Sequence, residues 1–352
     1  MPEQLLIELV RRYSPSRHET EAVSYLVDWM NAHGFRASVD DAGSACGVRG
    51  ADDAPNTLML LGHIDTFPGE IAVRVEDGIL YGRGSVDAKG SLCAFAAAAA
   101  QAAIPEHWRV IVVGAVEEEC ATSKGAYFVR DHFEPTLCII GEPSGSGRIT
   151  LGYKGRLLID YELSQPAAHS ARPEPSAAAI GAAFWQAIVD WAARENSGAD
   201  GYFEQVMPRL NQIHSNNDAF HERVALTVGF RLPPRWPPEA VLDVVSRLAT
   251  DSATLQPRGM ERAFQSSRTN PLTRAMTATI RAQGKTPGYI LKTGTSDMNV
   301  VGARWACPII AYGPGDSSLD HTPNEHLPLA EYSAAITTLQ TLIEQQLPVL
   351  RL

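Results

Sequence analysis

Three apolar segments of this chain each end in side chains that suit metal binding or acid–base chemistry. In NTLMLLGHID the run ends at His63 and Asp65, which would point to the same face of a strand because side chains alternate with period two. The run RVIVVGAV leads into Glu118 and Glu119, and LCIIG leads into Glu142. If the three runs are neighbouring parallel strands, their carboxyl ends meet at the edge of the sheet where ligands bind in such folds. The five side chains would then converge on one site.

Two further segments complete a candidate ligand set. Asp87 lies in the loop GRGSVDAKG, and His321 opens the motif HTPNEH. Two imidazoles with three carboxylates suit Zn²⁺ and similar divalent ions. Carboxylates shared between two ions hold them about 3.5–4 Å apart, and the ions activate a water molecule. Asp65 would orient His63 through its second ring N–H. The pattern therefore predicts a hydrolase whose metal ligands are His63, Asp87, Glu119, Glu142 and His321.

Each of these residues has an ordinary explanation when taken alone. Three adjacent glutamates are typical of a solvated loop, and a single histidine is more often a surface or core residue than a ligand. The recurrence of such side chains after successive apolar runs is what favours a metal site. Other motifs are not formed: GRGSVD has aspartate at the third glycine of a dinucleotide fingerprint, GSVDAKGS has lysine before glycine instead of a phosphate loop, and GEPSGSG lacks the nucleophile-elbow order.

Composition narrows the class of protein. The chain has 352 residues, 45% of them hydrophobic, which is enough for two domains or for one domain with an insertion. A net charge of −10 without a basic stripe argues against a nucleic-acid partner. The charged N-terminal segment does not resemble a signal peptide, and the alanine-rich run at 92–104 is too short to cross a bilayer. Five scattered cysteines fit a reducing compartment, so we expect a cytoplasmic protein without membrane association.

Hydrophobic periodicity predicts an α/β fold with a mostly parallel sheet flanked by helices. The first part of the chain alternates helices (3–12, 18–33, 89–103, 122–132) with apolar strands (58–62, 109–114, 137–140). From about residue 151 the pattern changes to one alternating strand, a helix at 175–194, a strand at 225–232 and a helix that begins with prolines, which indicates a smaller α+β insertion. We expect a catalytic domain at 1–155 and 266–352 and an inserted domain at 156–265.

The motifs in their order resemble those of the dizinc aminoacylase and carboxypeptidase family, which includes acetylornithine deacetylase and succinyl-diaminopimelate desuccinylase. The matching pieces are GHIDTFPG, YGRGSVDAKG, the VEEE and KGA segments, IGEPS, AAHSARP, GTSD and HTPNEH. The resemblance implies a zinc-exopeptidase type of sheet and an inserted lid or dimerisation domain. It also implies two divalent metal ions, of which Zn²⁺ is favoured, while Co²⁺ and Mn²⁺ accept the same ligands.

The resemblance assigns further roles to particular residues. Asp87 would bridge the ions, His63 and Glu142 would lie on opposite sides of it, and Glu119 and His321 would lie beside different ions. Glu118 would be the general base, and Asp65, which orients His63, would also count among the catalytic residues. His169 would reach the substrate oxyanion, in dimeric relatives from the opposite subunit, which implies a homodimer. Contacts to the substrate carboxylate would come from Tyr153, Lys154, Arg231 and Thr295.

Within this family, the chain length, the triple glutamate and KTGTSDMN most resemble the deacylases of the carrier-dependent lysine pathway. In that group lysine or ornithine is joined as a γ-glutamyl amide to the C-terminus of a small acidic carrier protein, LysW. The resemblance implies a metal-dependent hydrolase that releases the amino acid from this carrier. The alternatives are an N-acetyl or N-succinyl amino-acid deacylase or a dipeptidase and, more distantly, a metal-binding scaffold without turnover.

Overall fold

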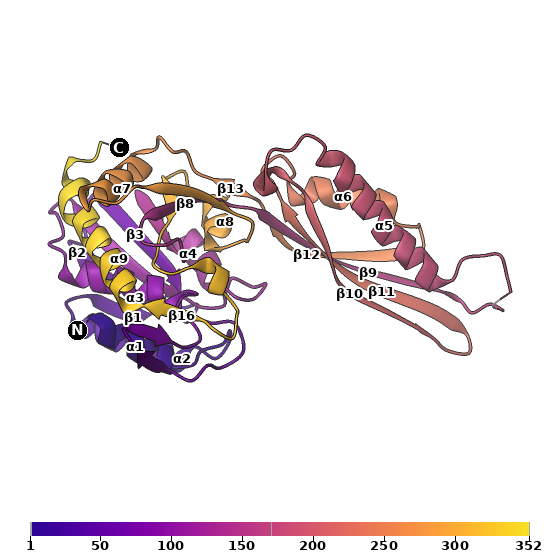
Figure 1. Cartoon of the computed structure of the whole chain (residues 1–352), viewed down its shortest axis with the longest axis horizontal. Helices are drawn as coiled ribbons and strands as arrows, with labels where there is room; N and C mark the ends of the chain where they lie inside the picture. The colour runs from indigo at the N-terminus through magenta and orange to yellow at the C-terminus, as the bar shows by residue number, and fades with distance from the viewer. Residues whose placement is uncertain (1, 170, 352) are drawn as a thin grey trace. The chain divides into compact units, whose positions relative to one another are not determined.

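The computed structural model describes residues 2–169 and 171–351 (Figure 1). The chain forms two compact units. The first consists of Met1–Gly152, Ser266–Leu291 and Ser296–Leu352, and the second of Tyr153–Gln265 with the short segment Lys292–Thr295. The chain thus leaves the first unit after Gly152 and returns at Ser266, and it visits the second unit again for four residues.

The first unit is built on a mixed sheet whose centre is parallel. Strands β6 (Trp108–Ala115), β3 (Asn56–His63), β7 (Leu137–Gly141) and β15 (Ile309–Ala311) pair in parallel in this order. Antiparallel strands β2 (Ala45–Gly50) and β1 (Arg36–Val39) extend one side, and β8 (Arg148–Tyr153) with β14 (Gly288–Lys292) the other. Seven of the eight residues of β3 are buried, as expected for a strand covered on both faces. The mostly parallel sheet predicted from the sequence is confirmed.

Helices pack around this sheet and form one large core with it. They are α1 (Pro2–Arg11), α2 (Thr20–Ala32), α3 (Lys89–Gln101), α4 (Lys124–His132), α7 (Pro271–Ala282), α8 (Asp297–Gly302) and α9 (Leu329–Thr341), followed by η3 (Leu342–Gln346) and η4 (Leu347–Val349). The alanine-rich α3 is buried from Lys89 to Ala99. It approaches the strand ends closely: a Cβ atom added to Gly141 would lie 2.9 Å from the ring of Phe95. Small residues on both elements therefore allow α3 to place the loop before it beside the ends of β3 and β7.

Short elements complete the first unit. Strands β4 (Arg74–Glu76), β5 (Ile79–Tyr81) and β16 (His326–Pro328) form a three-stranded antiparallel sheet. A single turn, η2 (Ser317–Leu319), precedes His321. Because β5 leads into the loop with Asp87 and β16 follows His321, pairing of these two strands brings the two loops together. In the described part of the chain, no helix combines the length and the apolarity needed to cross a membrane.

The second unit is a four-stranded antiparallel sheet in the order β10 (Met207–Asn217), β11 (His221–Leu232), β9 (Gly155–Pro166), β12 (Ala253–Glu261). Helices α5 (Ala177–Glu195) and α6 (Pro238–Leu248) cover one face of this sheet (Figure 1). Their core includes Tyr161 stacked on Phe184. The single strand predicted across residues 151–164 is in fact two strands, because Lys154 interrupts it between β8 and β9. The short element η1 (Tyr202–Glu204) completes the unit, whereas β13 (Phe264–Gln265) is the last strand in the order of the nine-stranded sheet that contains β8.

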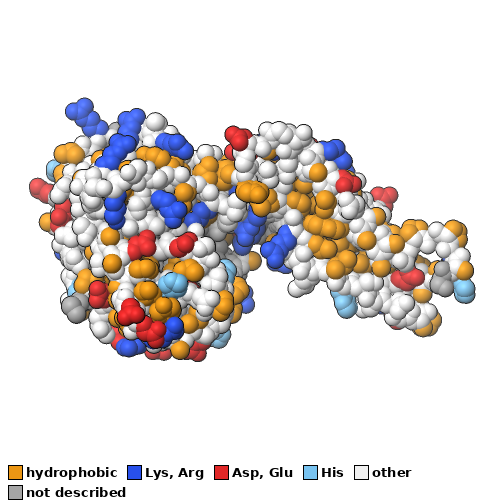
Figure 2. Space-filling view, in the orientation of Figure 1, with side chains coloured by type: hydrophobic (Ala, Val, Ile, Leu, Met, Phe, Trp, Pro, Cys, Tyr) orange, Lys and Arg blue, Asp and Glu red, His pale blue; other side chains and the backbone are white. Residues whose placement is uncertain are grey.

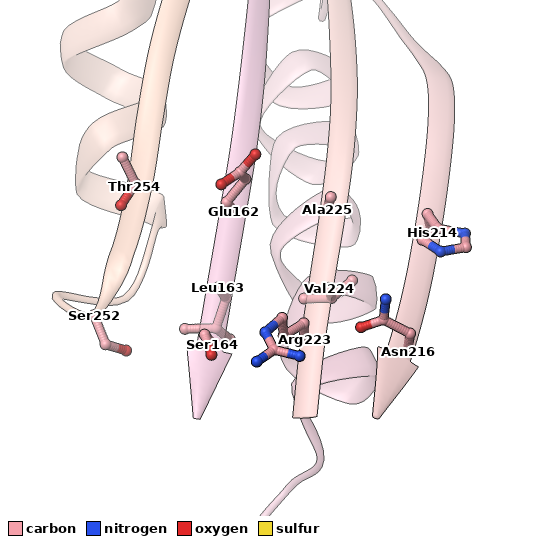
Figure 3. A pocket seen from close by; sticks show the side chains of 10 residues that line it. All are labelled: Glu162, Leu163, Ser164, His214, Asn216, Arg223, Val224, Ala225, Ser252 and Thr254. Atoms are coloured by element: carbon pink, nitrogen blue, oxygen red, sulfur yellow. The ribbon is translucent and has the colours of Figure 1, made fainter. Parts of the chain in front are cut away.

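Surfaces of the second unit differ on the two sides of the sheet. The face opposite the helices carries a pocket of about 350 Å³, whose lining includes Glu162 on β9, Arg223 on β11 and His214 on β10 (Figure 3). On the helical side, hydrophobic side chains gather over α5 and α6 (Figure 2). A second pocket, of about 300 Å³, lies there between Ile180 and Leu248. No predicted metal ligand or general base lines either pocket.

Candidate active site

Four of the predicted site residues lie at the carboxyl ends of adjacent parallel strands. His63 is the last residue of β3, Glu142 directly follows β7, and Glu118 and Glu119 come shortly after β6. The order β6, β3, β7 in the sheet brings the three strand ends together. The convergence predicted from the apolar runs is therefore a property of the fold, and it arises because all three strands run in the same direction.

Asp87 lies between the two predicted histidine ligands. Its Oδ1 atom is 3.3 Å from Nε2 of His63, and its Oδ2 atom is 3.1 Å from Nε2 of His321. Burial raises the pKa of the Asp87 carboxyl, but the hydrogen bonds from His321 and His63 outweigh burial and leave the pKa well below its usual range. An ionised carboxylate whose two oxygens face different imidazoles has the arrangement of a bridging ligand.

Glu119 shares one side of this arrangement with His321. Its Oε1 atom is 3.0 Å from Nε2 of His321, the same nitrogen that faces Asp87. Glu119 and His321 are thus in direct contact, and the expectation that they lie beside different ions stays a prediction. Burial and the charge of Asp87 raise the pKa of Glu119 to about 7. Hydrogen bonds that the ring donates to the carboxylates of Asp87 and Glu119 raise the pKa of His321 to about 10.

The His321 imidazole has further support from Phe67, in the motif GHIDTFPG. The two rings stack with centroids 4.1 Å apart and planes at 14°. The His321 side chain is 43% exposed, and its backbone has a positive φ of 61°. This unusual backbone conformation turns the side chain back toward Asp87 and Glu119, where the flat contact with Phe67 limits its rotation.

Asp65 holds the site together mainly through backbone groups. The Nδ1 atom of His63 is 2.9 Å from the carbonyl oxygen of Asp65 and 3.6 Å from its carboxylate, so the carbonyl orients the imidazole. The Asp65 carboxylate accepts hydrogen bonds from the N–H groups of Glu118 and Glu119, both at 3.0 Å, and from the hydroxyl of Ser16 at 2.7 Å. Asp65 is fully buried. One residue therefore fixes both the first histidine and the glutamate loop.

Further carboxylates surround the site. Burial raises the pKa of Glu118 well above its usual value, and the charges of Asp297, Glu142 and Glu119 add to this effect. Asp297, the first residue of α8, is 2% exposed, and its Oδ1 atom has no hydrogen-bond partner among the described residues. Burial, followed by the charges of Asp65 and Glu142, raises the pKa of Asp297 to about 7.

The crowding of acids fits a cationic cofactor. Carboxylates that repel one another in a desolvated site destabilise the fold unless cations compensate them. Ligand atoms of His63, Asp87 and Glu119 all lie within 4.8 Å of one another, which is compact enough for one metal ion. His321 and Glu142 border this cluster. The donor set of nitrogen and carboxylate oxygen atoms is suited to divalent ions.

The sequence reasoning did not single out three residues of this region. Ser16 bonds to Asp65, Asp297 borders the acidic cluster, and Glu325 bonds to the backbone of Asp87. Asp297 and Glu325 belong to the motifs GTSD and HTPNEH, in which the sequence assigns a role only to Thr295 and to His321. Ser16 has no sequence signal, because its contact with Asp65 spans 49 positions.

The remaining predicted residues belong to the second unit, where the structure joins two of them. Nη1 of Arg231 donates to Oγ1 of Thr295 at 2.6 Å, and that hydroxyl lies 3.2 Å from the carbonyl oxygen of Lys154. The buried Lys154 ammonium donates to the carbonyl oxygens of Tyr202, at 2.8 Å, and Gln205. Its charge is therefore engaged by backbone groups.

Tyr153 and His169 lie apart from this hydrogen-bonded pair. Tyr153 is buried, and the ammonium of Lys292 lies 5.7 Å from the centre of its ring. His169 is exposed in the loop between β9 and α5. The N–H of Ala171 donates to Nδ1 of His169 at 3.2 Å. A role in substrate binding stays a prediction for all five of these residues, Tyr153, Lys154, Arg231, Thr295 and His169.

A mostly parallel sheet with a histidine and carboxylate cluster at the carboxyl ends of its strands defines a metal-dependent hydrolase. The profile of Peptidase family M20/M25/M40 matches residues 59–345, and the chain belongs to this family. The family membership predicted from the motifs is thereby confirmed, and with it a hydrolase that acts on amide bonds.

Individual relatives agree with this assignment. The chain is 45% identical over 344 residues to the LysW-lysine hydrolase of Deinococcus radiodurans, covering 96% of this chain and 94% of the relative. It is 25% identical over 354 residues to the LysW-lysine/LysW-ornithine hydrolase of Saccharolobus islandicus, covering 97% and 95%. The fold is similar to that of the M20 metallo-carboxypeptidase Sso-CP2 from Sulfolobus solfataricus, with a TM-score of 0.78, 17% identity and 99% coverage of both chains.

Proposed function

We propose that this chain hydrolyses the γ-glutamyl amide that joins lysine to the C-terminus of the carrier protein LysW. The observation that carries the catalytic part is the position of Asp87, whose two carboxylate oxygens face His63 and His321. The observation that carries the substrate part is 45% identity, over nearly the whole chain, with a LysW-lysine hydrolase. Ornithine is the second candidate amino acid, because the relative from Saccharolobus islandicus bears both names.

Two divalent ions, with Zn²⁺ favoured over Co²⁺ and Mn²⁺, would be held by the five ligands His63, Asp87, Glu119, Glu142 and His321. When bound, they would supply a polarised substrate carbonyl and a water molecule of lowered pKa. The chain's own contribution is to keep five side chains from distant segments at fixed positions. Asp65 achieves this for His63 and for the loop of Glu119 through the hydrogen bonds described above.

Glu118 is the proposed general base. Its backbone N–H is tied to Asp65, so its side chain starts from a fixed position beside Glu119. The carboxylate takes one proton from the attacking water, whose oxygen bonds to the amide carbonyl carbon. When the C–N bond breaks, the same carboxyl gives that proton to the leaving amine of lysine. The products are a free carrier carboxylate and lysine, and Glu118 is returned to its ionised state.

Substrate recognition would involve the second unit. The guanidinium of Arg231, which is held by Thr295, presents a cation suited to a carboxylate. His169 would stabilise the developing oxyanion from its exposed loop. Lys154 contributes in this proposal by fixing the position of Thr295, because its carbonyl oxygen lies beside the threonine hydroxyl. Tyr153, adjacent to Lys154 in the chain, would line the same substrate region.

A homodimer is the proposed assembly. Strand β10 lies at the edge of its sheet and pairs with β11, so its other side is open among the described residues. Neighbouring residues include the exposed side chains of Ile213 and Phe220, which are 52% and 76% accessible. Exposed strand edges and apolar side chains favour association with another chain. Light scattering after size exclusion should give twice the mass of 38.1 kDa, and a monomer at micromolar concentration would contradict this proposal.

Steady-state hydrolysis tests the substrate assignment. Purified enzyme with added Zn²⁺ or Co²⁺ is offered LysW-lysine, LysW-ornithine, N-acetyl-lysine, N-acetylornithine and a dipeptide. We expect kcat/KM to be at least about a hundredfold higher for a carrier-linked amide. A preference for a small acyl amino acid or a dipeptide would contradict the carrier assignment while retaining the hydrolase. Metal binding without turnover of any substrate would contradict both.

A further inference from the structure

A buried carboxylate outside the predicted ligand set connects the two loops that carry Asp87 and His321. Glu325 is 0% exposed. Its Oε1 atom accepts hydrogen bonds from the backbone N–H groups of Val86, at 2.9 Å, and Asp87, at 3.1 Å. Its Oε2 atom accepts a hydrogen bond from Nη1 of Arg83 at 2.9 Å. These hydrogen bonds all connect the carboxylate to the segment that ends at Asp87.

Arg83 extends this connection. Its side chain is 6% exposed, and its Nε atom donates to the carbonyl oxygen of Gly69 at 2.9 Å. The backbone of Glu325 takes part as well, because its carbonyl oxygen accepts the N–H of Gly82 at 3.3 Å. The segment from Gly82 to Asp87 is therefore held to Glu325 at both of its ends. A buried ion pair that satisfies additional N–H groups recovers much of the cost of desolvation, and it imposes a defined geometry.

The connection bears directly on the distance between two metal ligands. Glu325 lies four positions after His321, so one short segment carries both residues. Oδ2 of Asp87 lies 3.1 Å from Nε2 of His321. We propose that Glu325 is a positioning residue, which fixes the backbone of Asp87 so that one carboxylate can serve both ions of the proposed metal centre. This inference rests on the proposed two-ion function, and it adds Glu325 to the residues that support the proposed metal centre.

The variant Glu325→Gln removes the charge with little change of volume. An amide offers one oxygen and one NH₂ group, so it cannot accept from Arg83 and from the two backbone N–H groups at the same time. Either the ion pair or the backbone contact is lost, and the loop before Asp87 gains freedom. Residues that support metal ligands change metal affinity by about 10- to 100-fold when altered. The affinity for both ions should fall, and it should fall more for the ion held by Asp87 and His321.

The matched control is Glu261→Gln. Glu261 is 5% exposed and forms a two-pronged pair with Arg156, at 2.9 and 3.0 Å, in the second unit. This substitution breaks a carboxylate and guanidinium pair in a unit that contains none of the five predicted metal ligands. Metal is removed from three chains, the wild type, Glu325→Gln and Glu261→Gln. The Zn²⁺ affinity of each is then measured by titration in competition with a chromophoric chelator. A second titration follows the visible absorption of bound Co²⁺, and thermal unfolding is recorded for each chain.

We expect Glu325→Gln to bind its weaker equivalent of Zn²⁺ at least about tenfold less tightly than wild type. The Co²⁺ spectrum should change at the same time, while Glu261→Gln keeps the wild-type affinities and spectrum. Wild-type affinities in Glu325→Gln would overturn the inference, even if its melting temperature falls, because the residue would then support only the fold. If Glu325→Gln does not fold, Glu325→Asp keeps the charge and shortens the reach; wild-type affinities there would overturn the inference equally.

The readout separates this inference from the proposed function. A wild-type chain that binds fewer than two ions would contradict the proposed two-ion function and this inference together. A wild-type chain that binds two ions and hydrolyses its substrate, beside a Glu325→Gln variant with unchanged affinities, would leave the proposed function in place and contradict the role of Glu325 alone.

Discussion

The carboxylate of Asp65 accepts the backbone N–H of Glu118, the proposed base, with a distance of 3.0 Å from Oδ1 to the nitrogen. The two residues are 53 positions apart and belong to loops that follow different strands. Through this bond and its partner to Glu119, a buried acid sets the backbone position of the proposed base and of a proposed ligand simultaneously. Loss of the Asp65 carboxylate should therefore disturb metal binding and proton transfer together.

Asp65→Asn tests this relationship. An amide retains one acceptor oxygen for three donors, so at least one N–H of the glutamate loop loses its partner. We expect Zn²⁺ affinity and kcat/KM each to fall about 10- to 100-fold. Ser16→Ala removes one of the same three donors and leaves both N–H bonds, so its effect should be several-fold at most. Equal effects of the two variants, measured by chelator competition and steady-state kinetics, would refute the assigned role.

Glu118→Gln separates catalysis from metal binding. The amide cannot accept the proton of the attacking water, so kcat should fall by about 10²- to 10⁴-fold while two equivalents of metal remain bound. The neighbouring glutamate provides a control, because Glu117 interacts with Thr122 and Arg17. Glu117→Gln should retain turnover near the wild-type level. Metal content by emission spectroscopy and hydrolysis of the preferred substrate are measured side by side, and comparable losses in both variants would count against Glu118 as the base.

In the metal-free chain, buried carboxyl groups should make the free energy of unfolding depend on pH. The pKa values of Glu119 and Asp297 are raised to about 7 in the folded chain, chiefly by burial, above their usual values of 4.5 and 3.8. The folded metal-free chain therefore holds more protons than the unfolded chain between about pH 4 and pH 7. Its free energy of unfolding should consequently fall as the pH rises through this window.

Bound divalent ions would remove this dependence by compensating the carboxylates. We expect the metal-free chain to be less stable at pH 7 than at pH 5, and the difference between metal-loaded and metal-free chains to grow over the same range. Urea unfolding at several pH values, with and without Zn²⁺, measures both quantities. A pH-independent difference would show that the acidic cluster is not relieved by metal.

Lys154 should make the free energy of unfolding depend on pH with the opposite sign. Burial lowers the pKa of its ammonium from 10.5 to about 8, so the unfolded chain holds more protons than the folded chain between these values. The free energy of unfolding should rise with pH across this window. Lys154→Met removes the titrating group, and the rise between pH 8 and 10.5 should be smaller in the variant, as measured by urea unfolding. An identical rise in both chains would show that Lys154 keeps an ordinary pKa.

Much of the fold could be predicted from the chain itself, because buried parallel strands and amphipathic helices have distinct periodicities. The apolar runs before His63, Glu118 and Glu142 became β3, β6 and β7. Edge strands were not predicted: β1, β10 and β12 have exposed and mixed side chains, and their stability comes from pairing with a neighbour. The break at Lys154 was missed because alternation continues across it, although the boundary between the two units falls two residues earlier, after Gly152.

The candidate metal ligands could be named from the sequence because their chemistry is local: each is a histidine or an acid at the end of an apolar run or in a short motif. The contacts that position them could not. These contacts depend on distances between segments that are remote in sequence. They include the contact of Glu119 with His321, the choice between the carbonyl and the carboxylate of Asp65 as the group that orients His63, and the hydrogen bond from the backbone of Asp87 to Glu325. Residue types determine which ligands are available, whereas the packing of strands, loops and α3 determines the atoms that meet.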